Sequence, residues 1–138
     1  MLIDKVFVYG SLRSDMFNYE KLLKGKVSKV QKGSIKGKLF HLENKGYPAV
    51  IQGYDRIQGE LMELRNFEQT LRELDELENY IVDNNINCEY IRKIVEVELD
   101  NGQMVKAYYY EYNPKSNVNI NDKLIPVLNG DWKQYMNV

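Results

Sequence analysis

Hydrophobic residues alternate with polar ones in several segments of the chain and recur at helical spacing in others. Alternation predicts strands over residues 2–9, 27–42, 47–51, 57–64, 90–99 and 103–112, with a break near Gly33 and turns at 43–46 and 53–55. Helical spacing predicts a short helix over residues 15–23 and a clearer one over 67–78. A polar linker over 114–122 precedes a last apolar segment that contains Ile125 and Val127.

The two later strands predict their own register. Residues 100–102 form a three-residue hairpin loop that closes on Gly102, a residue suited to the left-handed conformation. This loop sets Val97 opposite Val105 and Glu96 opposite Lys106, so apolar meets apolar and opposite charges meet. The spacing therefore predicts an antiparallel hairpin in a defined register.

These elements indicate an α+β domain. About six strands accompany only two or three short helices, and the strands do not alternate regularly with helices as in a doubly wound fold. We expect a single domain over residues 1–138 with a mixed or antiparallel sheet curled into a small β-barrel.

One carboxylate of the 67–78 helix lies on the apolar side of the helical wheel. Phe67, Leu71, Leu74 and Leu77 define the stripe, and at about 100° per residue Glu78 falls within about 20° of Leu71. A carboxylate that loses hydration has a raised pKa and is a better proton acceptor near neutral pH. The alternative is that Glu78, in the last turn, swings outward to solvent.

A second candidate feature is the turn Tyr9-Gly10-Ser11-Leu12 directly after the first strand. A glycine at that junction allows backbone N–H groups to converge on an anionic or carbonyl oxygen. The turn matches neither the nucleophile elbow nor the P-loop. Ser11 could act as a nucleophile only if folding brought His41 to it, and we interpret His41 as structural.

Composition narrows the chemistry. The 138 residues include one Cys and one His, which excludes a disulfide framework and a conventional zinc site. With 19 Lys and Arg against 20 Asp and Glu the net charge is −1, which argues against a nucleic-acid partner. Carboxylates and 11 tyrosines remain plentiful, so an enzyme built on this chain would use Asp or Glu as its acid or base.

Charge is nevertheless uneven along the chain. Residues 21–42 contain seven lysines and no acid, which indicates either a rim that attracts anions or solvated faces and protected strand edges. No segment approaches the ~18 apolar residues of a membrane span, and the N-terminus lacks the pattern of a signal peptide. We expect a cytoplasmic protein without a membrane partner; the oligomeric state stays open.

Taken together, the motifs resemble those of the gamma-glutamylcyclotransferase-like family of small proteins. The matching segments run in order through most of the chain: VFVYGSL at 6–12, GYPAV at 46–50, GELMEL at 59–64, LDELENY at 74–80, YIRKIVEV at 90–97, AYYYEY at 107–112 and GDWKQY at 130–135. The family's catalytic glutamate stands in a segment like LDxxEG, which corresponds to Glu78. Asn79 replaces the frequent glycine after it, and Asn also tolerates a left-handed helix end.

The resemblance implies an enzyme that converts a γ-glutamyl amine or peptide to 5-oxoproline and a free amine without metal or organic cofactor. Glu78 would be the general acid and base, and the backbone of Tyr9, Gly10, Ser11 and Leu12 would hold substrate oxygens. The resemblance also places Pro48, Tyr90, Arg92 and Tyr110 at the cavity. Tyr108, Tyr109 and Tyr110 cannot all face it, because side chains alternate along a strand.

Two other classes of function remain open at this point. The fold could serve as a small-molecule or protein-binding module without turnover. It could also host a hydrolase that uses water in the same cleft and releases free glutamate. The identity of the leaving amine does not follow from the sequence.

Overall fold

The strands and helices of the protein follow the predicted order closely. The computed structural model describes residues 3–14, 16, 19, 23–78, 80 and 87–136, and the helix expected over 15–23 falls largely outside them. The elements are β1 (Lys5–Val8), β2 (Val27–Leu42), β3 (Tyr47–Leu64), α1 (Phe67–Leu77), β4 (Tyr90–Leu99), β5 (Met104–Tyr112), a 3₁₀ turn (Asn117–Asn119), β6 (Leu124–Pro126) and α2 (Trp132–Met136).

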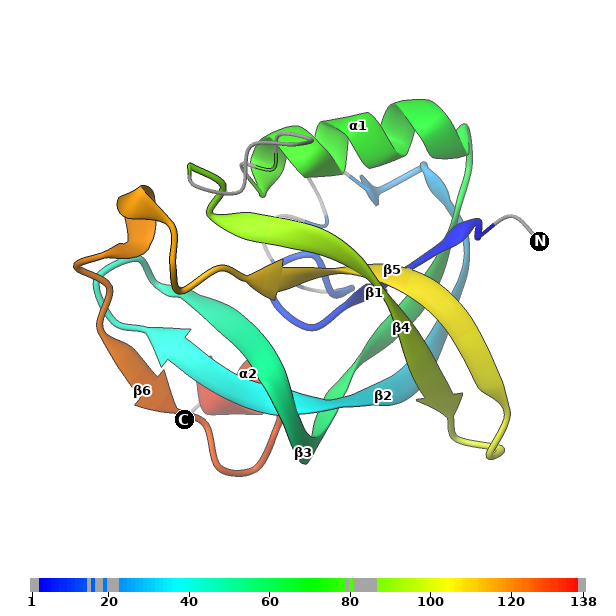
Figure 1. Ribbon diagram of the computed structural model, residues 1–138. Coiled ribbons are helices and arrows are strands. Elements are labelled where there is room, and N and C mark those ends of the chain that lie inside the picture. Colours follow the sequence, from blue (N-terminus) through cyan, green and yellow to red (C-terminus); the bar gives the residue numbers. More distant parts are fainter. Residues whose placement is uncertain are drawn as a thin grey trace.

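Five of the strands close into a barrel. They hydrogen-bond in the order β3-β1-β5-β4-β2, and β2 pairs again with β3 to complete the ring. The β1–β5 pair is parallel and the other pairs are antiparallel, while the short β6 extends the sheet from β2. The predicted α+β fold with a mixed, barrel-shaped sheet and short helices is confirmed. Figure 1 shows α1 on one side of the strands and α2 on the other.

Two apolar clusters fill the molecule, and β1 contributes to both. Val6 and Val8 pack in one cluster with Leu71 and Leu74 of α1. Phe7 and Tyr9 point the other way, into a cluster that Trp132 of α2 completes. A strand buried on both faces needs hydrophobic residues at consecutive positions, and residues 6–9 have this pattern.

Two strands continue where the sequence predicted a break or a turn, because the glycines there allow strands to pack closely or bulge. β2 runs unbroken through Gly33, where a Cβ would lie 2.8 Å from Val97, so the glycine permits close strand packing. β3 likewise continues through residues 53–55, and the predicted turn is wrong. The register instead shifts from Gly37↔Asp55 to Lys38↔Ile51, so β3 carries extra residues as a bulge at this point.

The β4–β5 hairpin forms in the predicted register. Val97 pairs with Val105 and Glu96 with Lys106. Gly102 has φ +86° and its N–H donates to the Leu99 carbonyl at 2.9 Å, which closes the loop. Local pairing preferences and turn geometry favour the same register, so the sequence alone was enough to predict it.

α1 ends one residue earlier than predicted, at Leu77. Leu71 and Leu74 are buried as expected, whereas Leu77 is 38% exposed and does not continue the stripe. Among the described residues no helix has the length and apolar character needed to cross a membrane.

Candidate active site

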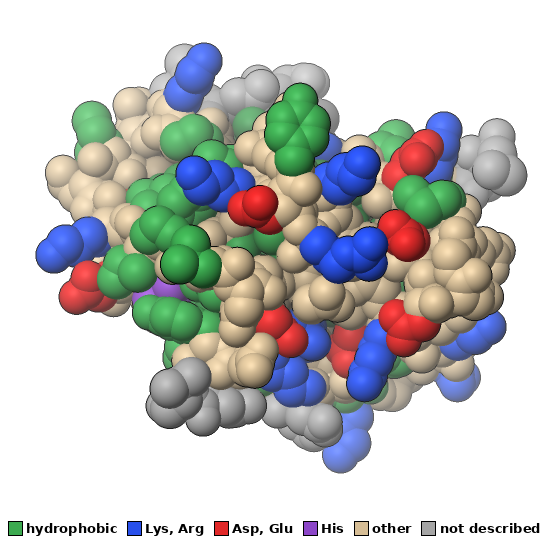
Figure 2. All heavy atoms as spheres, turned by 90° about the horizontal axis from the view of Figure 1, so that it is seen from below, with side chains coloured by type: hydrophobic (Ala, Val, Ile, Leu, Met, Phe, Trp, Pro, Cys, Tyr) green, Lys and Arg blue, Asp and Glu red, His purple; other side chains and the backbone are tan. Residues whose placement is uncertain are grey.

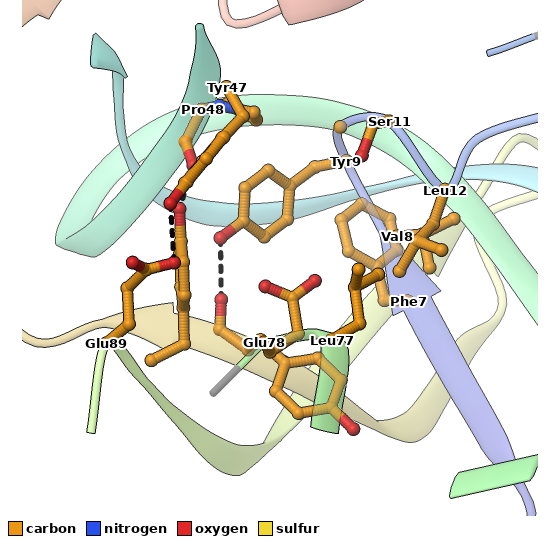
Figure 3. A pocket seen from close by; sticks show the side chains of 13 residues that line it. Phe7, Val8, Tyr9, Ser11, Leu12, Tyr47, Pro48, Leu77, Glu78 and Glu89 are labelled. Carbon is orange, nitrogen blue, oxygen red and sulfur yellow. Dashed lines mark hydrogen bonds between the residues drawn. The ribbon is translucent and has the colours of Figure 1, made fainter. Parts of the chain in front are cut away.

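A cavity of about 110 Å³ lies where the end of β1, the start of β3 and the C-terminal end of α1 meet. Figure 3 shows its walls. The lining residues are Phe7, Val8, Tyr9, Gly10, Ser11, Leu12, Tyr47, Pro48, Leu77, Glu78, Glu89, Tyr90 and Tyr110. Both features singled out in the sequence, the turn after β1 and Glu78, therefore border one space.

Glu78 stands directly after the last helical residue of α1. Its backbone is still near-helical (φ −83°, ψ 3°) and its N–H donates to the Leu74 carbonyl at 2.9 Å, so the side chain keeps the direction that the helical wheel predicts. The carboxylate points into the cavity between Tyr9 and Leu77 (Figure 3) and does not swing to the outer surface.

The environment of Glu78 favours its neutral form. Burial raises the pKa of this carboxyl to about 8, and the negative charge of Glu89 adds to the effect. Among the described residues no side chain or amide hydrogen-bonds to the Glu78 carboxylate. Within the described part of the chain the carboxylate is therefore buried without a hydrogen-bond donor, as expected of a group that exchanges a proton with a ligand.

The turn after β1 forms the opposite wall. The Tyr9 hydroxyl donates to the Tyr110 carbonyl at 2.6 Å, which anchors the beginning of the turn. A Cβ on Gly10 would lie 2.6 Å from Cγ of Pro48, so only glycine fits against that ring. Outside helices and strands, no backbone hydrogen bond between described residues starts from the amide of Gly10 or Leu12. These amides are suited to binding a substrate oxygen.

Buried polar contacts hold the continuation of this turn. Glu60 of β3 accepts hydrogen bonds from the Ser14 amide and hydroxyl, each at 2.6 Å. Arg13 pairs with Asp131 at 2.8 Å, and Lys133 of α2 donates to the Ser14 carbonyl at 2.7 Å. The C-terminal segment and β3 together therefore fix the shape of the turn.

Tyr90 and Tyr110 line the cavity with their rings, while their hydroxyl groups are used elsewhere. Tyr90 donates to the Pro48 carbonyl at 2.5 Å, and Tyr110 donates to Asp75 of α1 at 2.6 Å. Burial raises the pKa of both phenols above its ordinary value. Tyr109 points to the opposite apolar cluster, so the side chains alternate as expected.

Arg92 is not part of the cavity wall, contrary to expectation. Its guanidinium forms a 2.6 Å ion pair with Asp75 and lies over the rings of Tyr80 and Tyr108. Asp75 is on α1, one turn before Glu78, so Arg92 binds the helix to β4 and is absent from the cavity lining.

The structure adds a second acidic residue that sequence reasoning missed. Glu89 precedes β4 and accepts a 2.7 Å hydrogen bond from the Tyr47 hydroxyl and a 3.1 Å contact from Lys45. The sequence offered only one indication of Glu89 and Tyr47, which is that they are neighbours of the expected site residues Tyr90 and Pro48. Leu77, Phe7 and Val8 complete the missed lining residues.

Comparison with known proteins identifies the family of the chain. The profile of the family described as "Gamma-glutamyl cyclotransferase, AIG2-like" matches residues 6–134. The chain belongs to this family. A relative from Methanocaldococcus jannaschii, named "Putative gamma-glutamylcyclotransferase MJ1514", is 33% identical over 135 residues, which cover 96% of this chain and 98% of that protein.

Two solved structures share the fold. YkqA from Bacillus subtilis has a TM-score of 0.68 and 25% identity, covering 98% of this chain but only 41% of that larger chain. An AIG2-like protein from Mus musculus has a TM-score of 0.65 and 19% identity, covering 90% of this chain and 86% of that one. The predicted membership in the gamma-glutamylcyclotransferase-like family is confirmed.

Ser11 and His41 do not form a catalytic pair in this cavity. His41 Nδ1 accepts a 3.0 Å hydrogen bond from the Trp132 indole, and its ring packs on Tyr135. His41 is absent from the lining of the cavity that contains Ser11. The histidine thus stabilises the packing of α2 on β2, as its structural interpretation predicts.

Most of the described lysines of residues 21–42 face solvent. Lys29, Lys32, Lys36 and Lys38 are all exposed on β2, and no lysine lines the cavity among the described residues. In the face shown in Figure 2, basic and acidic side chains are interspersed. The described part of the chain also contains no group of three or more His, Cys, Asp or Glu arranged to hold a metal ion.

Proposed function

We propose that the protein converts a γ-glutamyl amine or peptide to 5-oxoproline and a free amine, with Glu78 as general acid and base. The observation that carries the proposal is the buried Glu78 carboxylate in the same cavity as the amides of the Tyr9–Leu12 turn. The family membership supports the reaction class. The substrate class and the role of Glu78 are our inference from the site.

The reaction needs a base, an oxygen-binding site and a fixed geometry. Glu78 takes a proton from the substrate α-ammonium, and the freed amine attacks the γ-carbonyl carbon of the same molecule. The carbonyl oxygen gains negative charge, which the amides of the turn stabilise. Glu78 returns its proton to the leaving nitrogen as the bond to that nitrogen breaks. The ring nitrogen gives its second proton to the released amine or to water, which leaves neutral 5-oxoproline. Tethering of nucleophile and electrophile supplies much of the rate.

The acidity of Glu78 suits this proton transfer. Its pKa of about 8 lies close to that of an α-amino group, about 7.7–8.0, so the proton moves between partners of similar affinity. An ordinary surface glutamate, with a pKa near 4.3, would be a much weaker base. The burial of Glu78 therefore matches the task assigned to it.

The test is product analysis with a panel of γ-glutamyl amines and γ-glutamyl amino acids. Release of 5-oxoproline with one equivalent of amine supports the proposal. Release of free glutamate instead would assign a hydrolase, and binding with recovery of unchanged ligand would assign a non-catalytic module. Either result, obtained across the panel, overturns the cyclotransferase assignment.

A further inference from the structure

The ionisable side chains of the cavity wall are acidic or phenolic where the structure describes it. Its described lining contains two carboxylates, Glu78 and Glu89, and neither Lys nor Arg. The mechanism proposed above uses Glu78 and leaves Glu89 without a role. Glu89 faces the cavity all the same and contributes to the raised pKa of Glu78.

Glu89 is held firmly in this orientation. One oxygen accepts from the Tyr47 hydroxyl at 2.7 Å, and the other lies 3.1 Å from Lys45 Nζ. The same lysine also reaches Asp122 at 2.8 Å and Asn119 at 2.8 Å. The side chains of Lys45, Glu89 and Asp122 are only 18%, 16% and 2% exposed. One cation shared between two carboxylates leaves this group with a net charge of −1.

The position of Glu89 matches the leaving group better than the nucleophile. In Figure 3, Glu89 and Tyr47 lie across the cavity from Ser11 and Leu12, with Glu78 between them. If the turn holds the glutamyl oxygens and Glu78 reaches the reacting nitrogens, the departing amine extends toward Glu89. A second carboxylate next to the α-ammonium would oppose its deprotonation, whereas one next to the leaving group does not.

We propose that Glu89 is a specificity-determining residue that selects γ-glutamyl compounds whose leaving amine carries a second, positive charge, such as a diamine or polyamine. It disfavours leaving groups that carry a carboxylate, because two like charges would share a poorly hydrated site. This inference rests on the proposed function and narrows its substrate class.

Three γ-glutamyl compounds of similar length test the inference: the conjugates of 1,4-diaminobutane (cationic), n-pentylamine (neutral) and 4-aminobutanoate (anionic). We expect kcat/KM to fall by at least tenfold from the cationic to the neutral compound, and again to the anionic one. The cationic preference should weaken as ionic strength rises. Equal turnover of the cationic and neutral compounds would overturn the inference and leave the cyclotransferase assignment intact.

Variants then assign the preference to Glu89. Glu89→Gln keeps an oxygen for the Tyr47 hydroxyl and should reduce the cationic-to-neutral ratio by at least tenfold, while Glu89→Asp restores part of it. The ratio is compared at each pH, so that any change in Glu78 acidity cancels. Glu96→Gln, an exposed glutamate of β4, is the matched control and should leave the ratio unchanged. An unchanged ratio in Glu89→Gln contradicts the assignment.

Binding separates the two proposals. Calorimetry with the Glu78→Gln variant measures affinity for the three compounds without turnover, and we expect the same order, cationic above neutral above anionic. If this order appears but wild-type protein makes no 5-oxoproline, the proposed reaction fails while the charge selectivity stands. If the three compounds bind equally, the selectivity is refuted.

Discussion

Both carboxylate oxygens of Glu60 accept hydrogen bonds from Ser14, one from its amide and one from its hydroxyl, each at 2.6 Å. Glu60 is 6% exposed, so its charge depends on these contacts for stabilisation. Ser14 follows the turn that lines the cavity, and Lys133 holds its carbonyl from the other side. The geometry of residues 9–12 therefore depends on contacts from β3 and α2 that lie outside the cavity.

Removing the Ser14 hydroxyl tests this support. Ser14→Ala leaves one oxygen of buried Glu60 without its donor, so we expect the free energy of unfolding to fall by about 1–3 kcal/mol. A looser turn should raise KM several-fold with a smaller effect on kcat. Chemical denaturation and steady-state kinetics measure both effects. Ser28→Ala is the control, because Ser28 is exposed and its hydroxyl donates to the Glu63 carbonyl. Equal behaviour of the two variants would refute the supporting role of Ser14.

The contact between Gly10 and Pro48 predicts a steric effect. Gly10→Ala would place a methyl group 2.6 Å from Cγ of Pro48, which forces the turn and the proline apart. We expect kcat/KM to fall by at least tenfold and stability by about 1–3 kcal/mol. Combining it with Pro48→Ala removes the clashing atoms and should recover part of both losses. Simple additivity of the two substitutions in a double-mutant cycle would contradict the steric explanation.

The raised pKa of Glu78 predicts a bell-shaped pH dependence of kcat/KM. The acidic limb should report ionisation of Glu78 in the free enzyme, near pH 8, because the protonated carboxyl cannot accept a proton. The basic limb should report loss of the substrate ammonium proton, also near pH 8. Activity at pH 6 should therefore be about tenfold or more below that at pH 8. A profile that is flat from pH 6 to 8 would exclude Glu78 as the titrating base.

The raised pKa of Glu78 should also make folding stability depend on pH. The pKa of Glu78 is higher in the folded protein, about 8, than in the unfolded chain, so the folded state binds more protons between these values. The contribution of protonated Glu78 to the free energy of unfolding is fully present below the pKa of the unfolded chain. It is lost as pH rises through about 8. Glu78→Gln does not ionise, so at pH 9 it should be more stable than wild type by about 5 kcal/mol, and at pH 5 the difference should be about 1 kcal/mol. Parallel stability curves for the two proteins would contradict this account.

Local signals predicted much of the fold. The β4–β5 register and the α1 helix follow from neighbouring residues, because pairing preferences and helical periodicity act over short distances. Gly33 and Gly53 misled the prediction, since a glycine that admits a packed strand looks the same in sequence as one that turns the chain. Whether a glycine bends or packs depends on partners far along the chain.

In the candidate site, too, features that depend on nearby residues could be predicted, and features that depend on distant partners could not. Glu78 could be selected because its helix reports which way it points, and the Tyr9–Leu12 turn because it ends a strand. The roles of Glu89 and Arg92 could not be predicted from the sequence, because they depend on contacts made only in the folded protein. Lys45 and Tyr47 fix Glu89 toward the cavity, whereas Asp75 holds Arg92 away from its wall.

The most direct test of the account compares Glu78→Gln with Glu76→Gln, measuring 5-oxoproline formation from a γ-glutamyl amine. Both residues belong to the end of α1, but Glu76 is exposed and Glu78 faces the cavity. We predict that Glu78→Gln lowers kcat by about 10²–10⁴-fold with the fold intact, as expected for loss of a general acid and base, while Glu76→Gln retains wild-type activity. Wild-type turnover in a folded Glu78→Gln protein would contradict the central claim.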